Sequence, residues 1–390
     1  MKKKATIALL ILASFLMLAL PVLGAAKNDF PLLDKLMKAD FGAKKKVAEF
    51  IRSKYPDLRM EIFRFVSKNS PETLTLIRAE KMQLIADKYP GLPVKLPRAV
   101  LSDLEKKYPC PIMDIAVDVT GLIKDKYPML PAEVVRWRSD SKIKSKTVRV
   151  IMRKHATLIP DVMKVMAEGN YPQQVNSLKA DLKEMMAKKH PGLKEKVKLE
   201  VVSLVVTKYP DLPVKIAAIK ENPKKNPRIA IIEMICKEHP EFINDVVRTV
   251  RDKHGTEIHE AVMDALKLVE DKYPKLITDL PRDMSAMIAK KHPTLMTDIA
   301  RVRMDSRHSV RAKVEKKYPG LRKDVKDMIA KKYPNLGEDV SLSIEKNFPG
   351  LKKDMADMMK TKFSGFMASV KEHINKKHPR LMPDVEKMLK

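Results

Sequence analysis

The chain has 390 residues, of which 44% are hydrophobic, so it can bury a sizeable core and wholesale disorder is disfavoured. Only 11 glycines accompany 25 methionines, a composition that favours helices over sheets. The formal net charge of +29 favours anionic partners, namely nucleic acid, lipid head groups, acidic glycans or acidic proteins.

The N-terminus has the layout of a secretory signal. Three lysines, Lys2 to Lys4, precede an apolar run from Ala5 to Leu20, and small residues from Gly24 to Ala26 follow. This layout predicts a signal peptide over residues 1–24 and a secreted or periplasmic product. The alternative is a membrane anchor over residues 5–23, because this apolar run is nearly long enough to span a bilayer. Export disfavours nucleic acid as the partner and favours envelope lipids and glycans.

A ring-bearing residue followed by proline recurs along the chain, usually after two lysines and before a leucine. Lys316 to Leu321 and Lys188 to Leu193 are two copies, with Tyr and His as the ring residue. The signature prolines are spaced mainly 15 or 19 residues apart, and such a period indicates a repeat protein. Degenerate copies without proline lie at residues 154–158, 253–255 and 362–365. The prolines are Pro56, Pro71, Pro90, Pro109, Pro128, Pro172, Pro191, Pro210, Pro240, Pro274, Pro293, Pro319, Pro334, Pro349 and Pro379.

Each unit is predicted to be a short helix of roughly 10 to 15 residues. After Pro319, the apolar residues Leu321, Val325 and Met328 lie on one helical face. In many units an acidic residue stands five positions after the signature proline and the lysine pair stands at the other end, which suits the helix macrodipole. The ring–proline step is expected to end the helix, since a residue before proline avoids the α region.

These units predict an all-α protein, an α-solenoid-like array of short helices joined by aromatic-proline turns. Short helices must bury their apolar faces against neighbours, and short connections favour antiparallel packing of consecutive helices. We expect a signal peptide, an N-terminal segment over residues 25–50 and helical repeats over 51–137. Repeats with basic interruptions follow over 138–228, and further repeats over 229–390.

The interruptions of the repeat are candidates for function, because insertions in repeat arrays map to loops on one face. They span Trp137 to Lys146, Lys220 to Arg228 and Arg301 to Arg311. Tryptophan beside arginine is typical of binding hot spots, although Trp137 is equally explained by packing. The candidate contacts with an anionic partner are Arg136, Trp137, Arg138, Lys142, Lys144, Lys146, Lys224, Lys225 and Arg228.

Histidine and methionine are abundant but follow the repeat. Seven of the nine histidines occupy the position where other units have Tyr or Phe, so they are predicted to pack as flat rings. Methionines recur on the apolar face and are predicted to fill the core. Metal handling by His and Met is the lesser alternative. The seven are His155, His190, His239, His254, His292, His308 and His378.

No catalytic or cofactor motif is present, so neither an enzyme nor a bound cofactor is predicted. Cys110 and Cys236 leave open one disulfide or two isolated thiols, because spacing does not determine geometry. The expected function is that of an exported basic binding or scaffold protein that engages anionic envelope components or partner proteins. The alternative is a self-assembling fibre or layer, because the final helix, Met382 to Lys390, lacks a polar cap.

Overall fold

The computed structural model describes residues 35–36, 39–139, 148–149, 151–221, 226–304 and 310–389. All regular elements within these ranges are helices, which confirms the predicted all-α class for this part of the chain. None of the described helices is both long enough and apolar enough to cross a membrane. The predicted signal peptide, residues 1–24, lies outside the described residues.

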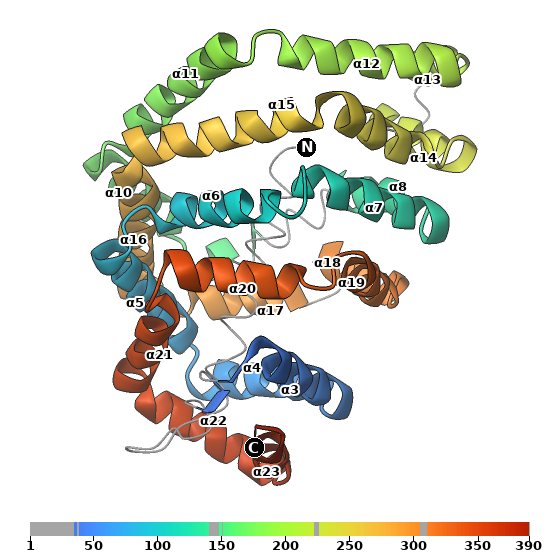
Figure 1. The fold of residues 1–390 in the computed structure, drawn as a ribbon. Coiled ribbons are helices and arrows are strands. Elements are labelled where there is room, and N and C mark those ends of the chain that lie inside the picture. The colour runs from blue at the N-terminus through green and yellow to red at the C-terminus, as the bar shows by residue number, and fades with distance from the viewer. Residues whose placement is uncertain are drawn as a thin grey trace.

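The helices fall into four consecutive groups along the chain (Figure 1). The first group is α3 (Phe41–Lys54), α4 (Leu58–Asn69), α5 (Thr73–Lys88), α6 (Leu92–Glu105), α7 (Pro111–Lys126) and α8 (Leu130–Ser139). The second is α10 (Leu158–Glu168), α11 (Tyr171–Lys189), α12 (Leu193–Lys208) and α13 (Leu212–Glu221). The third is α14 (Pro227–Glu238), α15 (Phe242–Lys272), α16 (Pro274–Lys291) and α17 (Leu295–Met304). The fourth is α18 (Val310–Lys317), α19 (Leu321–Lys332), α20 (Leu336–Asn347), α21 (Leu351–Lys362), α22 (Ser364–Lys377) and α23 (Leu381–Met388).

Most helices end at the ring residue of the signature. Tyr89 caps α5 with φ −133° and ψ 53°, outside the helical region, while its N–H still donates to the Ile85 carbonyl at 2.9 Å. After the proline, the N–H of Leu92 donates back to the Tyr89 carbonyl at 3.0 Å. The turn therefore satisfies the last backbone groups of one helix and starts the next within three residues.

The degenerate copy at residues 253–255 does not end a helix. α15 continues through it for 31 residues, and Gly255 is buried in the middle. Without proline at this position the backbone N–H is kept and the α region stays open to His254, so nothing forces a break. The prediction of a short helix in every unit is wrong here.

Consecutive helices follow one another in rows, and each row packs against helices from a distant part of the chain (Figure 1). The expected antiparallel packing of consecutive helices is therefore wrong for most of the described chain, because the short ring–proline turn redirects the chain without reversing it. The first group packs on the fourth: α3 on α23, α4 on α22, α5 on α21, α6 on α20, α7 on α19 and α8 on α18. The second group packs on the third: α10 on α16, α11 and α12 on α15, and α13 on α14.

The core is divided among these pairings. Leu381 and Val385 of α23, both fully buried, pack in one cluster with Val47 and Leu58 from the start of the chain. The apolar face of the final helix is thus covered by α3 and α4. Another cluster contains the buried Met358 and Met359, together with Met367, in agreement with the prediction that methionines fill the core.

Candidate functional site

The lysine and ring residue that end one helix contact an acidic residue on a distant helix. Tyr108 donates its hydroxyl to Asp339 at 3.0 Å, and the neighbouring Lys107 forms a salt bridge with the same carboxylate. The contact is reciprocal, since the hydroxyl of Tyr333 donates to Asp118 at 2.8 Å. The two tyrosine rings meet edge to face with centroids 5.7 Å apart. We call such a set of two rings and their acidic partners a ring–acid node.

Four further ring pairs are in contact in the same way within the described residues. Their ring centroids lie 5.2 to 5.5 Å apart. In each pair, at least one ring, or the lysine before it, contacts a carboxylate on the helix that follows the other ring. The pairs are Tyr127/Tyr318, His155/His292, Tyr209/His239 and Tyr55/His378. The predicted packing of flat rings is confirmed for these pairs. The contact with a carboxylate was not predicted, because some units have Phe in the same position and Phe cannot form such a contact.

The acidic partners follow a spacing rule. In a 15-residue unit the acid stands five residues after the signature proline, as Asp324 does after Pro319, and in a 19-residue unit it stands nine after, as Asp118 does after Pro109. In both cases the next signature proline comes ten residues later, at Pro334 and Pro128. The extra turn of the longer unit therefore lies before the acid, and the register between acid and ring is kept. This fixed distance was the sequence signal for the partners in the longer units.

The node lysines are neutralised. The lysine directly before the ring residue forms a salt bridge with a carboxylate on another helix in thirteen units. The hydrogen bond from Lys126 holds the pKa of Asp324 below its usual range, and Lys272 does the same to the pKa of Asp181. These lysines hold helices together, so they are not a free positive edge for an anionic polymer.

The helix ends that flank two of the basic interruptions lie side by side. α8 packs antiparallel to α14, with Arg136 Nε donating to Glu233 Oε1 at 3.0 Å and the thiol of Cys236 lying beside the backbone of Ala132. This pairing places the end of α8, where the first interruption begins, beside the start of α14, where the second one ends.

The nine predicted contact residues divide into three groups. Arg136 is engaged with Glu233, and Trp137 is partly buried, as its packing interpretation expects. Arg138 and Arg228 are exposed at the adjoining ends of α8 and α14. The remaining five lie outside the described residues: Lys142, Lys144, Lys146, Lys224 and Lys225.

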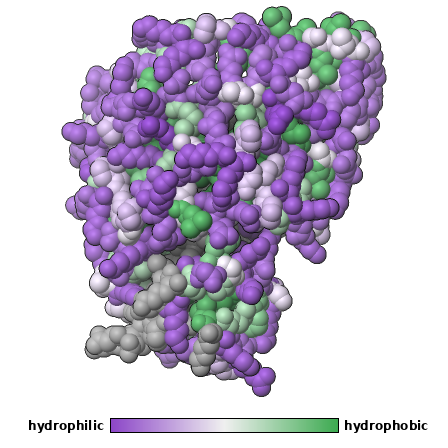
Figure 2. Space-filling model, in the orientation of Figure 1, coloured by the Kyte–Doolittle hydropathy of each residue, from purple (hydrophilic) through white to green (hydrophobic). Residues whose placement is uncertain are grey.

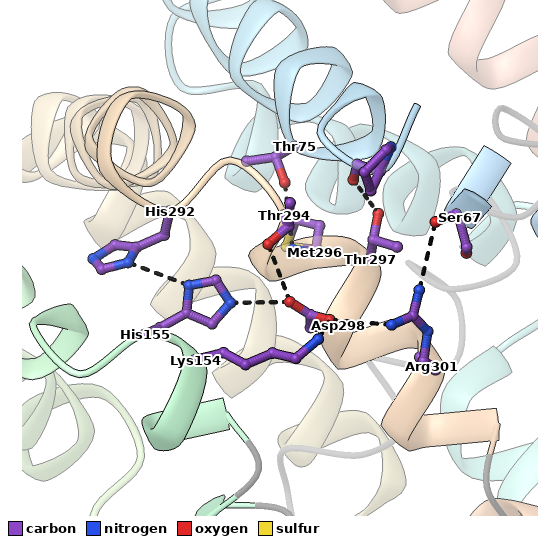
Figure 3. A network of polar contacts seen from close by, with 11 residues as sticks. Ser67, Thr75, Lys154, His155, His292, Thr294, Met296, Thr297, Asp298 and Arg301 are labelled. Carbon is purple, nitrogen blue, oxygen red and sulfur yellow. Dashed lines mark hydrogen bonds and ion pairs between the residues drawn. The ribbon is translucent and has the colours of Figure 1, made fainter. Parts of the chain in front are cut away.

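One node contains two buried histidines (Figure 3). Their Nδ1 atoms are 3.3 Å apart, and the side chains of His155 and His292 are 5% and 4% exposed. His155 Nε2 lies 3.2 Å from Asp298 Oδ2, and His292 Nε2 lies 3.1 Å from Asp161 Oδ2. Burial raises the pKa of Asp298, but hydrogen bonds from Lys154 and His155 outweigh it and hold that pKa below its usual range. Both carboxylates are therefore acceptors.

Within the described ranges, one group of three side chains has the types and distances that could hold a metal ion. Asp211, Glu238 and His239 offer atoms within 4.8 Å of one another. The ammonium of Lys215 lies 2.5 Å from an oxygen of each carboxylate, in the position that a cation would take. The arrangement is an ion-pair cluster, and it does not favour a metal. The cysteines are two free thiols, Cys236 being buried and Cys110 partly buried.

An apolar face is exposed on α12 and α13. Leu199, Val202 and Val206 lie on one side of α12 with exposed fractions of 68%, 48% and 63%, and Val214 of α13 is 71% exposed. Figure 2 shows hydrophobic surface over this corner of the molecule. α12 packs on α15 by its other side, while α15 itself packs between α12 and the row of α6 and α7. The α12–α13 row is therefore an end of the stack of rows.

Comparison with known protein families, curated proteins and solved structures finds no match for this chain.

Proposed function

We propose that the protein is an exported basic binding or scaffold protein with an α-solenoid-like repeat architecture that engages an anionic envelope component. The observation that supports this best is that the end of α8 adjoins the start of α14, because one basic interruption follows α8 and another precedes α14. Between positions 136 and 149 the chain has six basic residues and one acid, and between positions 220 and 228 it has four basic residues and one acid. Both segments start or end on this one helix pair.

A lysine or arginine that is already paired with a carboxylate attracts an anionic partner only weakly. The salt bridges therefore indicate which basic residues remain available to bind such a partner. The lysines at the helix ends are engaged by carboxylates of the nodes. Arg138 and Arg228 are exposed, and no acid in the described residues contacts their side chains in a salt bridge. Basic side chains in such a position attract phosphate and carboxylate groups over about a Debye length. A phospholipid or acidic glycan surface of the envelope fits the predicted export.

The test compares two variants that each lose four positive charges. The site variant replaces Arg138, Lys224, Lys225 and Arg228 by Gln, and the control replaces Lys290, Lys316, Lys331 and Lys376, the exposed first lysines of four pairs. Binding to anionic and to neutral phospholipid vesicles is measured over a range of salt concentrations. We expect the site variant to bind anionic vesicles on the order of 1,000-fold more weakly, because each of the four basic residues near such a surface contributes about 1 kcal/mol.

The control should lose much less affinity, and the wild type should lose affinity as salt rises. Equal losses in the two variants would show that net charge acts without a site. Binding that does not weaken with salt would overturn the electrostatic proposal altogether.

Self-association is the second candidate, and the exposed face of α12 and α13 supports it. The final helix does not support self-association, because its apolar face is buried against α3 and α4. Terminal rows of a helical array need a polar outer surface to remain monomeric. The α12–α13 row exposes the apolar side chains of Leu199, Val206 and Val214 among its polar ones, and a second copy of the same face would cover them. A self-complementary contact of this kind closes into a dimer and does not propagate into a fibre.

A further inference from the structure

We propose that His155 and His292 form a pH-operated clasp that holds α10 on the junction of α16 and α17. His155 lies three residues before α10 and His292 caps α16. Each ring reaches a carboxylate of the other side, since His155 contacts Asp298 of α17 and His292 contacts Asp161 of α10. The two rings then contact each other through their Nδ1 atoms at 3.3 Å.

The number of protons in the clasp follows from these three contacts. A carboxylate only accepts, so each Nε2 must be protonated to donate to Asp298 or Asp161. The contact between the Nδ1 atoms needs one further proton, donated by one ring and accepted by the other. Three protons on two imidazoles give the pair a single positive charge. In this state all three contacts are hydrogen bonds.

Any other proton count breaks a contact. With two protons, either the two Nδ1 lone pairs face each other at 3.3 Å or a carboxylate faces a bare nitrogen. With four protons, two N–H groups point at one another and two imidazolium rings repel. Because both rings are more than nine-tenths buried, water does not readily replace the lost partner. The clasp is therefore strongest with one shared proton and weakens in both directions of pH.

The charged groups around the pair oppose the fourth proton. Lys154 contacts Asp298 at 2.7 Å, and Lys291 forms a salt bridge with Asp161, so each carboxylate already has a cation. Arg301 of α17 adds a further positive charge 3.6 Å from Asp298. Three cations thus face two carboxylates before either ring is charged. Acidification that places a fourth proton on the pair is therefore expected to open the clasp.

The two ring–acid nodes in which both rings are tyrosines lack this property. The Tyr108/Tyr333 and Tyr127/Tyr318 nodes donate hydroxyls to their carboxylates and have no proton shared between the rings. Tyrosine keeps its proton over the whole range from pH 5 to 8. The chain therefore contains its own control, a node of the same shape that does not respond to pH.

Opening the clasp would separate α10 from the rest of the molecule at a junction of four helices. The far side of α17 is fixed to α4 and α5: the backbone N–H of Met296 lies 3.3 Å from Thr75 Oγ1, and the Thr297 hydroxyl donates to the Pro71 carbonyl (Figure 3). α17 remains anchored there when the histidines let go, so α10 is the element released.

The test measures amide hydrogen exchange of α10 and the imidazole nitrogen NMR signals between pH 5 and 8. In the wild type we expect one proton shared by the two rings at pH 7, and exchange of the α10 amides, corrected for intrinsic rates, at least about tenfold faster at pH 5. The double variant His155→Tyr/His292→Tyr, which copies the tyrosine nodes, should remove this pH dependence. His190→Tyr changes another histidine of the same position, and should leave the pH dependence intact.

Two results would overturn the clasp. One is independent titration of the two wild-type imidazoles with no shared proton, a measurement that does not depend on whether any variant folds. The other is a double tyrosine variant whose α10 exchange follows the same pH profile as the wild type.

Discussion

At the scale of single residues, the ring–acid nodes give each recurring side chain a physical role. The ring packs, its polar atom and the preceding lysine share one carboxylate, and the carboxylate is supplied from a distant helix. The rings, lysines and most acids were visible in the sequence. Their pairing was not, because all units repeat the same residues at the same spacing and any acid fits any ring. Only the three-dimensional arrangement of the rows selects Asp324 for Tyr127.

The nodes predict acid sensitivity. Lysine hydrogen bonds lower the pKa of several carboxyls that accept from a ring residue, as Lys126 does for Asp324, Lys272 for Asp181 and Lys88 for Asp354. A carboxyl with a lowered folded-state pKa stabilises the protein above its unfolded value near 4, and this stability is lost as the pH falls through the folded pKa. We expect the urea midpoint to fall steeply below about pH 4.

The control for this prediction is Asp324→Asn. It removes one of the titrating carboxyls, so the urea midpoint should fall less steeply below about pH 4 and should keep its pH dependence above that value. A urea midpoint that stays constant from pH 5 to pH 2.5 would contradict the role given to the nodes.

At the scale of helices, the ring–proline step marks most helix ends, but a helix can also end without it. Most ring–proline copies end helices as the sequence predicts, but Tyr171 and Pro172 begin α11, and the proline-free copy at residues 253–255 is crossed by α15. Another proline-free copy, at residues 362–365, still ends a helix, since Phe363 caps α21 and Ser364 begins α22. The sequence predicted each of these as a helix end, and this prediction is wrong where α15 continues through the repeat and where Tyr171 begins α11.

Proline substitution should separate these two positions. Gly255→Pro places proline inside α15, removes a helical hydrogen bond and should cost about 3 kcal/mol of unfolding free energy. Ser364→Pro places it at the first position of α22, where its fixed φ is suitable, and should change stability by less than about 1 kcal/mol. Urea unfolding followed by circular dichroism measures both. Similar costs at the two sites would mean that the proline does not control the boundary.

At the scale of the whole molecule, the described chain folds back so that α3 and α4 pack on α22 and α23. Leu36 and Val47 pack in one cluster with Leu381 and Val385, and this contact buries the helix that the sequence left uncovered. The short period favours local packing of neighbours, and it contains no information on which distant rows meet. The uncovered row is consequently in the middle of the sequence, at α12 and α13.

This row allows self-association to be tested directly. The double variant Leu199→Glu/Val206→Glu places charges on the exposed face of α12, and Leu342→Glu changes a single exposed leucine of α20 as a control. If a second copy covers α12 and α13, sedimentation velocity of the wild type should show a dimer that grows with concentration, because burial of apolar surface contributes about 25 cal/mol per Å². The double variant should remain monomeric and folded, since neither side chain lies in the core, and the α20 variant should dimerise as the wild type does. A wild type that sediments as a monomer at the highest soluble concentration would leave the basic ends of α8 and α14 as the surface through which the protein acts.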